Sequence, residues 1–189
     1  MRRCRLLFLY IGLWCAPALV LAAAPAPWRI DAALSTIEFT ATQAGARFVG
    51  RFRQWSGDIR FDAADLVHSQ AVVNVSLASV DTKSADRDAA LVTAAWFDPA
   101  HWPRAVFATR AIRANAQGFE ADAQLTIKGQ TRPVRLQFQV VKTSGGALRL
   151  TGTARLTRLA FGLGSGEFET TDWVGNDVEV RVVVVAHVR

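Results

Sequence analysis

From residue 35 onward, apolar and polar side chains alternate along nearly the whole chain. The pattern is fullest in 118–129, where every odd position from Phe119 to Ile127 is apolar and every residue between them is polar. Successive side chains of a β-strand point to opposite faces, so this alternation predicts strands with one apolar and one solvated face. Counting segments along the chain gives about eight predicted strands: 35–43, 46–62, 69–79, 104–115, 118–129, 132–142, 147–160 and 176–188. Strands of this kind are typical of antiparallel sheets, whose outer face is commonly in water.

Eight antiparallel strands with one continuous apolar face favour closure into a barrel. A closed barrel leaves no strand edge unpaired, and eight strands enclose an interior just wide enough for side chains or one small ligand. Strands of about 30 to 45 Å, at ~3.3 Å per residue, make that interior a tube. The fold class that we expect is therefore all-β, an eight-stranded antiparallel barrel with one short helix.

The expected interior mixes large rings with small residues. The rings are Phe39, Phe48, Phe52, Phe61, Phe107, Phe119 and Phe138, and the small residues are Ala41, Gly50, Ala121, Ala123, Gly152 and Ala154. Two interpretations follow, a barrel filled by its own rings or an apolar tunnel for a long chain. A tunnel would bind such a chain by burying its surface, at about 25 cal/mol per Å². Alternation alone does not distinguish the two.

One segment departs from the period of two. Residues 84–96 are rich in alanine, which favours a helix, and Ser84 is suited to the N-cap. Asp98-Pro99 would end this helix. We expect one short helix between the two halves of a single sheet.

The connections are those of a hairpin-rich single domain. Turns are expected at 128–131 and 144–146, where glycine permits positive φ. Pro133 is expected to start a strand, where its missing N–H is tolerated. The chain shows no repeat, low-complexity tract or linker, so residues 25–189 are predicted to form one domain.

The first 24 residues are predicted to be a cleaved signal peptide. Three arginines among the first five residues precede an uncharged apolar stretch that runs to about Val20, and small residues follow. This layout is typical of secretory leaders, with cleavage near residues 22–24. The stretch is also just long enough to span a membrane, but Pro17 and the alanines after it favour cleavage.

Cleavage would change both the thiol content and the charge of the chain. Both cysteines, Cys4 and Cys15, lie in the leader, so the secreted chain is expected to have no disulfide and no cysteine metal ligand. Loss of three arginines would lower the formal charge from +6 to +3. Without a basic stripe or a recognition motif, nucleic-acid binding is not expected.

Several motifs resemble those of the YceI-like family. They are Arg87-Asp88, Leu91, Trp96-Phe97-Asp98, Trp102-Pro103, Phe107, the run from Leu125 to Val134, Phe161-Gly162 after Arg158, and Val174-Gly175-Asn176. The resemblance extends from about Trp28 to the C-terminus. Three positions depart from the family pattern, because Ala90, Ala160 and 43–45 replace residues that often carry polar groups in the family.

The resemblance implies a lipocalin-like barrel, exported to the periplasm, that binds a polyisoprenoid, an isoprenoid quinone or another long-chain amphiphile. It therefore favours a tunnel over a filled core. It also implies a homodimer and a membrane b-type cytochrome as a partner. The three departures fall at positions where polar groups would hold a ligand headgroup. The headgroup contacts that the resemblance implies are therefore weakened more than the apolar tunnel that it implies.

The predicted site follows from the inward positions and the motifs. The apolar tunnel residues are Phe39, Phe48, Phe52, Phe61, Val75, Leu91, Phe107, Phe119, Leu125, Phe138, Leu150 and Phe161. Arg87, Asp88, Trp96 and Trp173 are predicted as headgroup contacts or as part of a gate formed by helix 84–96 and loop 162–176. For Arg87 and Asp88, a structural tie between the helix and a loop is the alternative.

The remaining polar residues show no catalytic or metal-binding pattern. His68, His101 and His187 are far apart and lack metal-ligand spacing, and no Gly-x-Ser-x-Gly elbow is present. The acidic residues of loop 162–176, namely Glu167, Glu169 and Asp172, leave a weak cation site as an alternative to a plain loop. We expect a non-enzymatic carrier without a cofactor. The alternative is a periplasmic protein-interaction module with a filled barrel, associated with a membrane redox complex.

Overall fold

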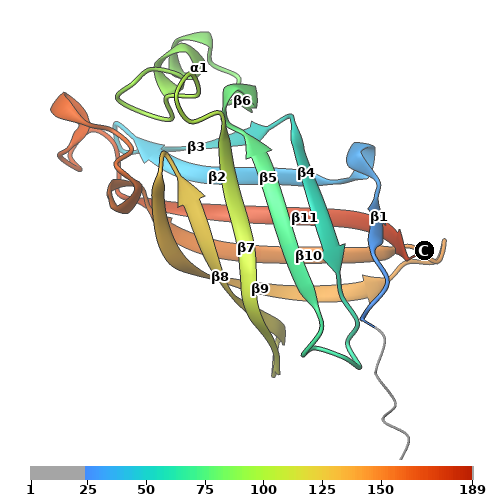
Figure 1. Ribbon diagram of the computed structural model, residues 1–189. Helices are drawn as coiled ribbons and strands as arrows, with labels where there is room; N and C mark the ends of the chain where they lie inside the picture. Colours follow the sequence, from blue (N-terminus) through green and yellow to red (C-terminus); the bar gives the residue numbers. More distant parts are fainter. Residues whose placement is uncertain (1–23, 189) are drawn as a thin grey trace, which may run out of the picture.

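The computed structural model describes residues 24–188. Residues 1–23, which hold nearly all of the predicted leader, lie outside the described residues. The described chain is a single strongly curled antiparallel sheet with one short α-helix (Figure 1). Its strands are β1 (Trp28–Ile30), β2 (Thr36–Gln43), β3 (Ala46–Phe52), β4 (Trp55–Arg60), β5 (Gln70–Ser76), β6 (Val80–Asp81), β7 (Arg104–Asn115), β8 (Gly118–Ile127), β9 (Gln130–Lys142), β10 (Leu148–Thr157) and β11 (Asp177–Val188). The predicted all-β class is confirmed.

The structure has eleven strands rather than the expected eight, because one predicted strand is divided in two and two short strands were not predicted. The strand order is β4-β5-β7-β8-β9-β10-β11-β2-β3-β6, and β1 pairs with β11. The predicted strand 46–62 is divided into β3 and β4, which lie near opposite ends of this order and are separated in sequence only by Arg53 and Gln54. The chain itself thus joins the two ends of the curled sheet. The short strands β1 and β6 were not predicted.

Alternation places the side chains as predicted on most strands. On β8, Ala121, Ala123 and Ile127 are buried. The cross-strand partners of the first two on β9, Leu136 and Val134, also face the interior. Two predicted strands are too long, because Leu77–Ser79 and Arg158–Phe161 form 3₁₀ turns at their ends.

The helix is shorter than predicted. Ser84 is its N-cap, but α1 comprises only Ala85–Leu91 rather than 84–96. The β-branched Val92 and Thr93 follow, and the amide of Phe97 donates to the carbonyl of Leu91 at 3.0 Å, so the chain turns back instead of continuing the helix. This compact turn places Trp96 and Phe97 in the core beneath α1.

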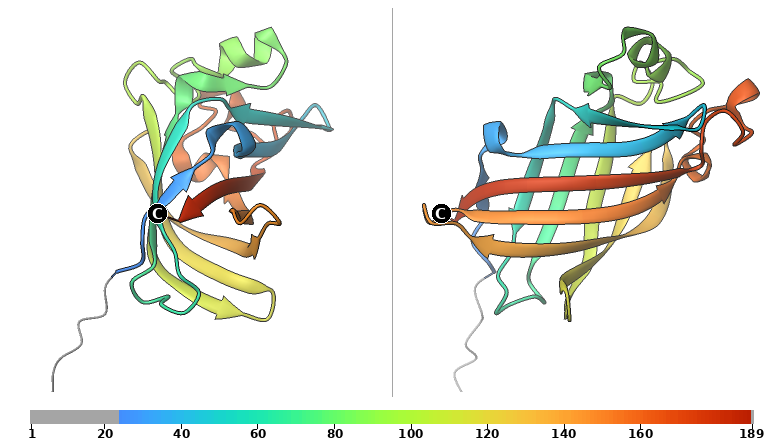
Figure 2. Two further views of the ribbon diagram at one scale, coloured as in Figure 1. Left: turned by 90° about the vertical axis from the view of Figure 1, so that its right-hand side faces the viewer. Right: turned by 180° about the vertical axis from the view of Figure 1, so that it is seen from behind.

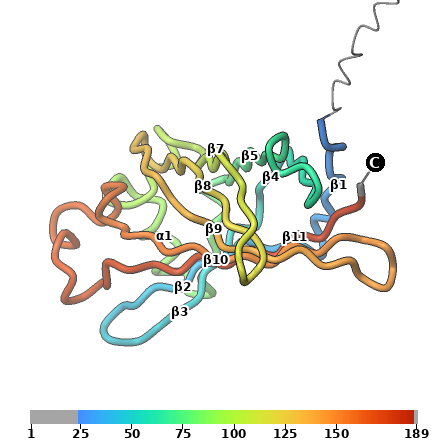
Figure 3. The backbone as a smooth tube through the Cα atoms, turned by 90° about the horizontal axis from the view of Figure 1, so that it is seen from below, coloured from blue at the N-terminus to red at the C-terminus, as the bar shows by residue number. Residues whose placement is uncertain are grey.

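The two ends of the barrel differ in what covers them. Strand β1 and the C-terminal end of β11 lie at one end, where both termini of the described chain are found (Figure 2). Helix α1, the β2–β3 hairpin and the segment between β10 and β11 gather at the other (Figure 3). We call this second end the gated end.

Candidate functional site

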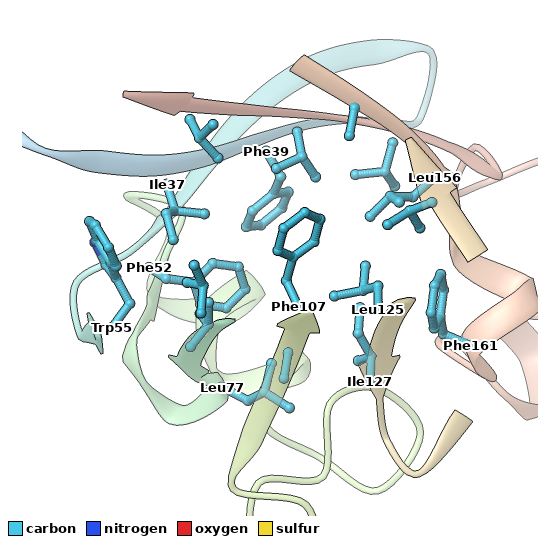
Figure 4. Close-up of a pocket in the computed structure, with 18 of the residues that line it drawn as sticks. Ile37, Phe39, Phe52, Trp55, Leu77, Phe107, Leu125, Ile127, Leu156 and Phe161 are labelled. Carbon is cyan, nitrogen blue, oxygen red and sulfur yellow. The ribbon is translucent and has the colours of Figure 1, made fainter. Parts of the chain in front are cut away.

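The interior is not filled by its own side chains. A cavity of about 570 Å³ lies inside the curled sheet, within the range of roughly 300–1,000 Å³ that is common for ligand pockets. Side chains from strands all around the barrel point into it, with Phe107 near its centre and Leu77, Ile127 and Ile37 around it (Figure 4). Nearly all of these side chains are apolar. The cavity can therefore hold a hydrocarbon, and it offers few partners to a polar one.

The cavity is bounded by an aromatic cluster at the end where the termini lie. The rings of Phe61 and Phe119 are 5.0 Å apart, those of Phe61 and Phe138 5.6 Å, and those of Trp28 and Phe61 5.9 Å. The Trp28 indole N–H donates to the carbonyl of Phe61 at 3.3 Å. Edge-to-face packing of this kind closes that end with rigid side chains.

A second aromatic cluster lies toward the gated end. The ring of Phe39 contacts those of Phe48 and Phe52, and Phe52 in turn contacts Phe97. Phe39 folds over Gly50, its partner on β3, where an added Cβ would lie only 2.3 Å from the ring. The Phe39 ring therefore occupies the space beside Gly50. The inward position of this glycine suggested that it would widen the cavity, but it does not.

Eleven of the twelve predicted apolar residues line the cavity. The exception is Phe119, which lies behind the wall and stacks on Phe138 with ring centroids 5.4 Å apart. Several lining residues were not among the twelve predicted tunnel residues: Ile37, Trp55, Leu77, Ile127, Leu156 and Phe168. Their inward positions follow from the same alternation, except that Leu77 and Phe168 lie in 3₁₀ turns.

Of the four predicted headgroup or gate residues, Arg87 and Trp96 line the cavity. Arg87 is half-buried at the start of α1, its Nε donates to the Gln43 side chain at 3.0 Å, and its guanidinium lies 3.9 Å from the Phe48 ring centroid. Ser84 and Asp86 line the same region, so a small polar patch occurs at the gated end. The position of Gln43, noted from the sequence only as a departure from the family, is thus part of this patch.

Asp88 and Trp173 do not line the cavity. The Asp88 carboxylate accepts from the backbone N–H of Thr82 at 2.8 Å and from its hydroxyl at 2.6 Å, which makes it a tie between α1 and the segment before it. Trp173 is 55% exposed on the outside of its loop. Neither side chain therefore lines the apolar interior, and the contacts of Asp88 match the alternative of a structural tie.

Arg158 is a buried residue whose role was not predicted. Its side chain is 3% exposed and donates only to backbone carbonyls, those of Leu163, Thr170, Val174 and Gly175, at 2.8–3.1 Å. Burial lowers the pKa of this guanidinium. The side chain holds the loop between β10 and β11 in one shape. Only its position before Phe161-Gly162 marked it in the sequence.

The two parts of the predicted gate are joined by hydrogen bonds. The carbonyl of Ala95 accepts from the amides of Gly164 and Ser165 at 2.8 and 3.1 Å. The Lys128 ammonium donates to the carbonyl of Ala94 at 2.6 Å and to that of Gly162 at 3.3 Å. The turn after β8 thereby fastens the segment after α1 to the loop after β10.

Residues 24–188 contain neither a metal-binding cluster nor a helix able to span a membrane. Within residues 24–188, no group of three or more histidine, cysteine, aspartate or glutamate side chains is arranged to hold a metal ion, so Glu167, Glu169 and Asp172 do not form such a cluster. Among the same residues, no helix has the length and hydropathy needed to cross a bilayer.

The sequence of this chain matches a known protein family. A model of the YceI-like domain matches residues 28–186, which is most of the chain. This protein belongs to the YceI-like family. A UPF0312 protein of Vibrio cholerae is 28% identical over 162 residues, covering 81% of this chain and 86% of the relative.

Solved structures with the YceI-like fold agree with the architecture. The crystal structure of BcnA from Burkholderia cenocepacia has a TM-score of 0.79 and 27% identity, and the match covers 84% of this chain and 99% of BcnA. A polyisoprenoid binding domain from Saccharophagus degradans, implicated in plant cell wall breakdown, has a TM-score of 0.67 over 87% of this chain and 99% of the domain. At 17% identity, this second likeness concerns the fold alone.

Proposed function

We propose that this protein is a carrier that holds one long-chain amphiphile, a polyisoprenoid or an isoprenoid quinone, in the interior of its barrel. The observation that carries the proposal is the cavity of about 570 Å³, which an elongated barrel keeps open between two aromatic clusters. A similar fold in Saccharophagus degradans is a polyisoprenoid binding domain, and this supports the proposed ligand class.

The chemistry of the lining fits an apolar chain. Each buried methylene of a ligand contributes about 0.8 kcal/mol, so a chain of many carbons binds well without any specific polar contact. The few polar groups at the gated end, among them Gln43 and Arg87, would lie near the end of such a chain. No chemical step is needed for this role, and the proposed activity is binding and transfer rather than catalysis.

The proposed setting is the periplasm, reached through the predicted leader. A carrier would protect an apolar chain from water while it moves between a donor and an acceptor. A membrane b-type cytochrome that uses an isoprenoid quinone is the acceptor that the family resemblance suggests.

A matched pair of substitutions tests the proposal. Ala154 lines the cavity and Thr153, the preceding residue of β10, is exposed on the outer face. Ala154→Phe fills the cavity and is expected to weaken binding of ubiquinone or of a C15–C20 prenol by tenfold or more. Thr153→Phe adds the same ring outside and should leave binding unchanged. Equal binding by both folded variants would contradict a ligand in the interior.

A further inference from the structure

The wall of the barrel is split between β9 and β10 at the gated end. The two strands pair only from Leu148↔Lys142 to Thr153↔Gln137, although both continue beyond this point. Residues 130–136 of β9 pair with β8 alone, because β9 bends away from β10 (Figure 1). Pro133 lies in this unpaired part of β9, where a residue without an N–H leaves no ladder bond unmade toward β10.

A groove of about 740 Å³ lies over this split on the outer face of the barrel. Five residues line both this groove and the interior cavity: Ala41, Val134, Leu156, Phe161 and Val178. At these residues the barrier between the two spaces is therefore only one residue thick. Elsewhere along β10, from Leu148 to Thr153, two paired strands and their ladder separate the interior from water.

The groove carries three arginines, one from each of three strands. They are Arg47 on β3, Arg132 on β9 and Arg155 on β10, and all are exposed. In the part of the chain that the structure describes, no carboxylate oxygen lies within 4.0 Å of these guanidinium groups, although Asp177 and Glu179 line the same groove. Arg132 donates only to neighbours on its own strand, the carbonyl of Thr131 and the side chain of Gln130. Exposed guanidinium groups that have no carboxylate within 4.0 Å are suited to binding a phosphate.

We propose that the split is a lateral portal and that the groove binds the phosphate headgroup of an amphiphile whose tail lies in the cavity. This inference rests on the proposed function and adds to it a headgroup chemistry and a place for that headgroup. Phe161 and Leu156 move aside to admit the tail between β9 and β10, and the three arginines hold the phosphate outside the barrel. A phosphate needs no burial in this arrangement, so the desolvation cost of placing it in the apolar cavity is avoided.

The test compares two ligands with the same tail, farnesyl phosphate and farnesol, on the full chain. Farnesyl phosphate is expected to bind about tenfold or more tightly, and this preference should shrink as salt is raised. In the variant Arg132→Gln/Arg155→Gln the preference is expected to disappear while farnesol binds as before. The control, Arg149→Gln/Arg181→Gln, removes two exposed arginines from β10 and β11 outside the groove and should keep the preference.

The possible outcomes separate the inference from the proposed function. Equal binding of the two ligands by the unmodified protein, or a phosphate preference that survives in Arg132→Gln/Arg155→Gln, overturns the portal site while leaving the carrier role intact. If inorganic phosphate binds to the groove as tightly as farnesyl phosphate, the groove is a free-anion site and the headgroup assignment fails. If neither farnesol, farnesyl phosphate nor ubiquinone binds, the carrier role fails first and the portal site with it.

Discussion

At the scale of single residues, the buried Arg158 is the strongest constraint on the gated end. Four backbone carbonyls accept hydrogen bonds from its guanidinium at 2.8–3.1 Å. We expect Arg158→Met to lower the free energy of unfolding by about 3 kcal/mol or more, because buried carbonyls would lose their partner. Urea denaturation measures this. Arg149→Met, on the exposed face of the same sheet, should change stability by less than about 0.5 kcal/mol.

A second residue-scale prediction concerns pH and Asp81. Its carboxylate, with a side chain only 8% exposed, accepts from the backbone N–H of Lys83 and from the guanidinium groups of Arg51 and Arg53, and these contacts lower its pKa. A lowered carboxyl pKa contributes stability at pH values above the ordinary pKa of about 3.9, and this contribution is lost as the pH falls through the lowered pKa. Asp81→Asn should therefore be less stable than the unmodified protein at pH 7, and the difference in the free energy of unfolding should shrink as the pH falls through the lowered pKa of Asp81. A gap that persists undiminished at acid pH would contradict this account.

At the scale of elements, Gly50 and Phe39 form a pair that fixes how β2 lies on β3. A methyl group at Gly50 would meet the Phe39 ring at 2.3 Å, so Gly50→Ala must displace the ring. We expect a loss of about 1–3 kcal/mol in the free energy of unfolding. Gly57→Ala on β4 is the control, since its nearest contact would be 3.2 Å, at the flexible end of Ile30. Equal losses in the two variants would show that glycine itself, rather than the ring, is responsible.

Lys128 links the two parts of the predicted gate, the segment after α1 and the loop after β10. Its ammonium reaches the carbonyls of Ala94 and Gly162. Lys128→Met should loosen the loop, and hydrogen exchange at the amides of Gly164 and Ser165 should quicken by about tenfold or more, because these amides bond to the neighbouring Ala95. Lys142→Met at the far end of β9 is the matched control and should leave both amides unchanged. Unchanged exchange in Lys128→Met would exclude Lys128 as the link.

Local pattern explains why most elements were predictable and a few were not. Alternation along β8 and β9 depends only on neighbouring residues, so the sequence shows it directly. The break at Arg53-Gln54 arises because the chain passes from one end of the sheet order to the other, which is a property of the curled sheet as a whole. The end of α1 at Leu91 likewise depends on the tertiary contacts of Trp96 and Phe97, which override the helix propensity of the alanines.

The candidate site, too, was predictable from the sequence only in part. Eleven of the twelve predicted tunnel residues line the cavity, most of them because a strand's period determines which side chains face the interior. Three features of the site involve residues that are distant in sequence or belong to separate strands. They are the Phe39 ring over Gly50, the four carbonyls around Arg158 and the split beside Pro133. Such long-range arrangements leave no periodic trace in the chain.

At the scale of the whole molecule, the proposed carrier function depends on whether the cavity holds a ligand. Aromatic clusters at the two ends keep the space between them open, and the hydrophobic effect favours filling it with an apolar chain. A protein that has folded around such a chain during secretion is expected to retain it through purification.

Native mass spectrometry of the protein purified from a secreting host, combined with analysis of its organic extract, tests this most directly. We expect one long-chain isoprenoid or quinone per chain, released on denaturation and absent from the Ala154→Phe variant. A protein that carries nothing and then binds neither isoprenoid quinones nor prenols when they are supplied would contradict the carrier function.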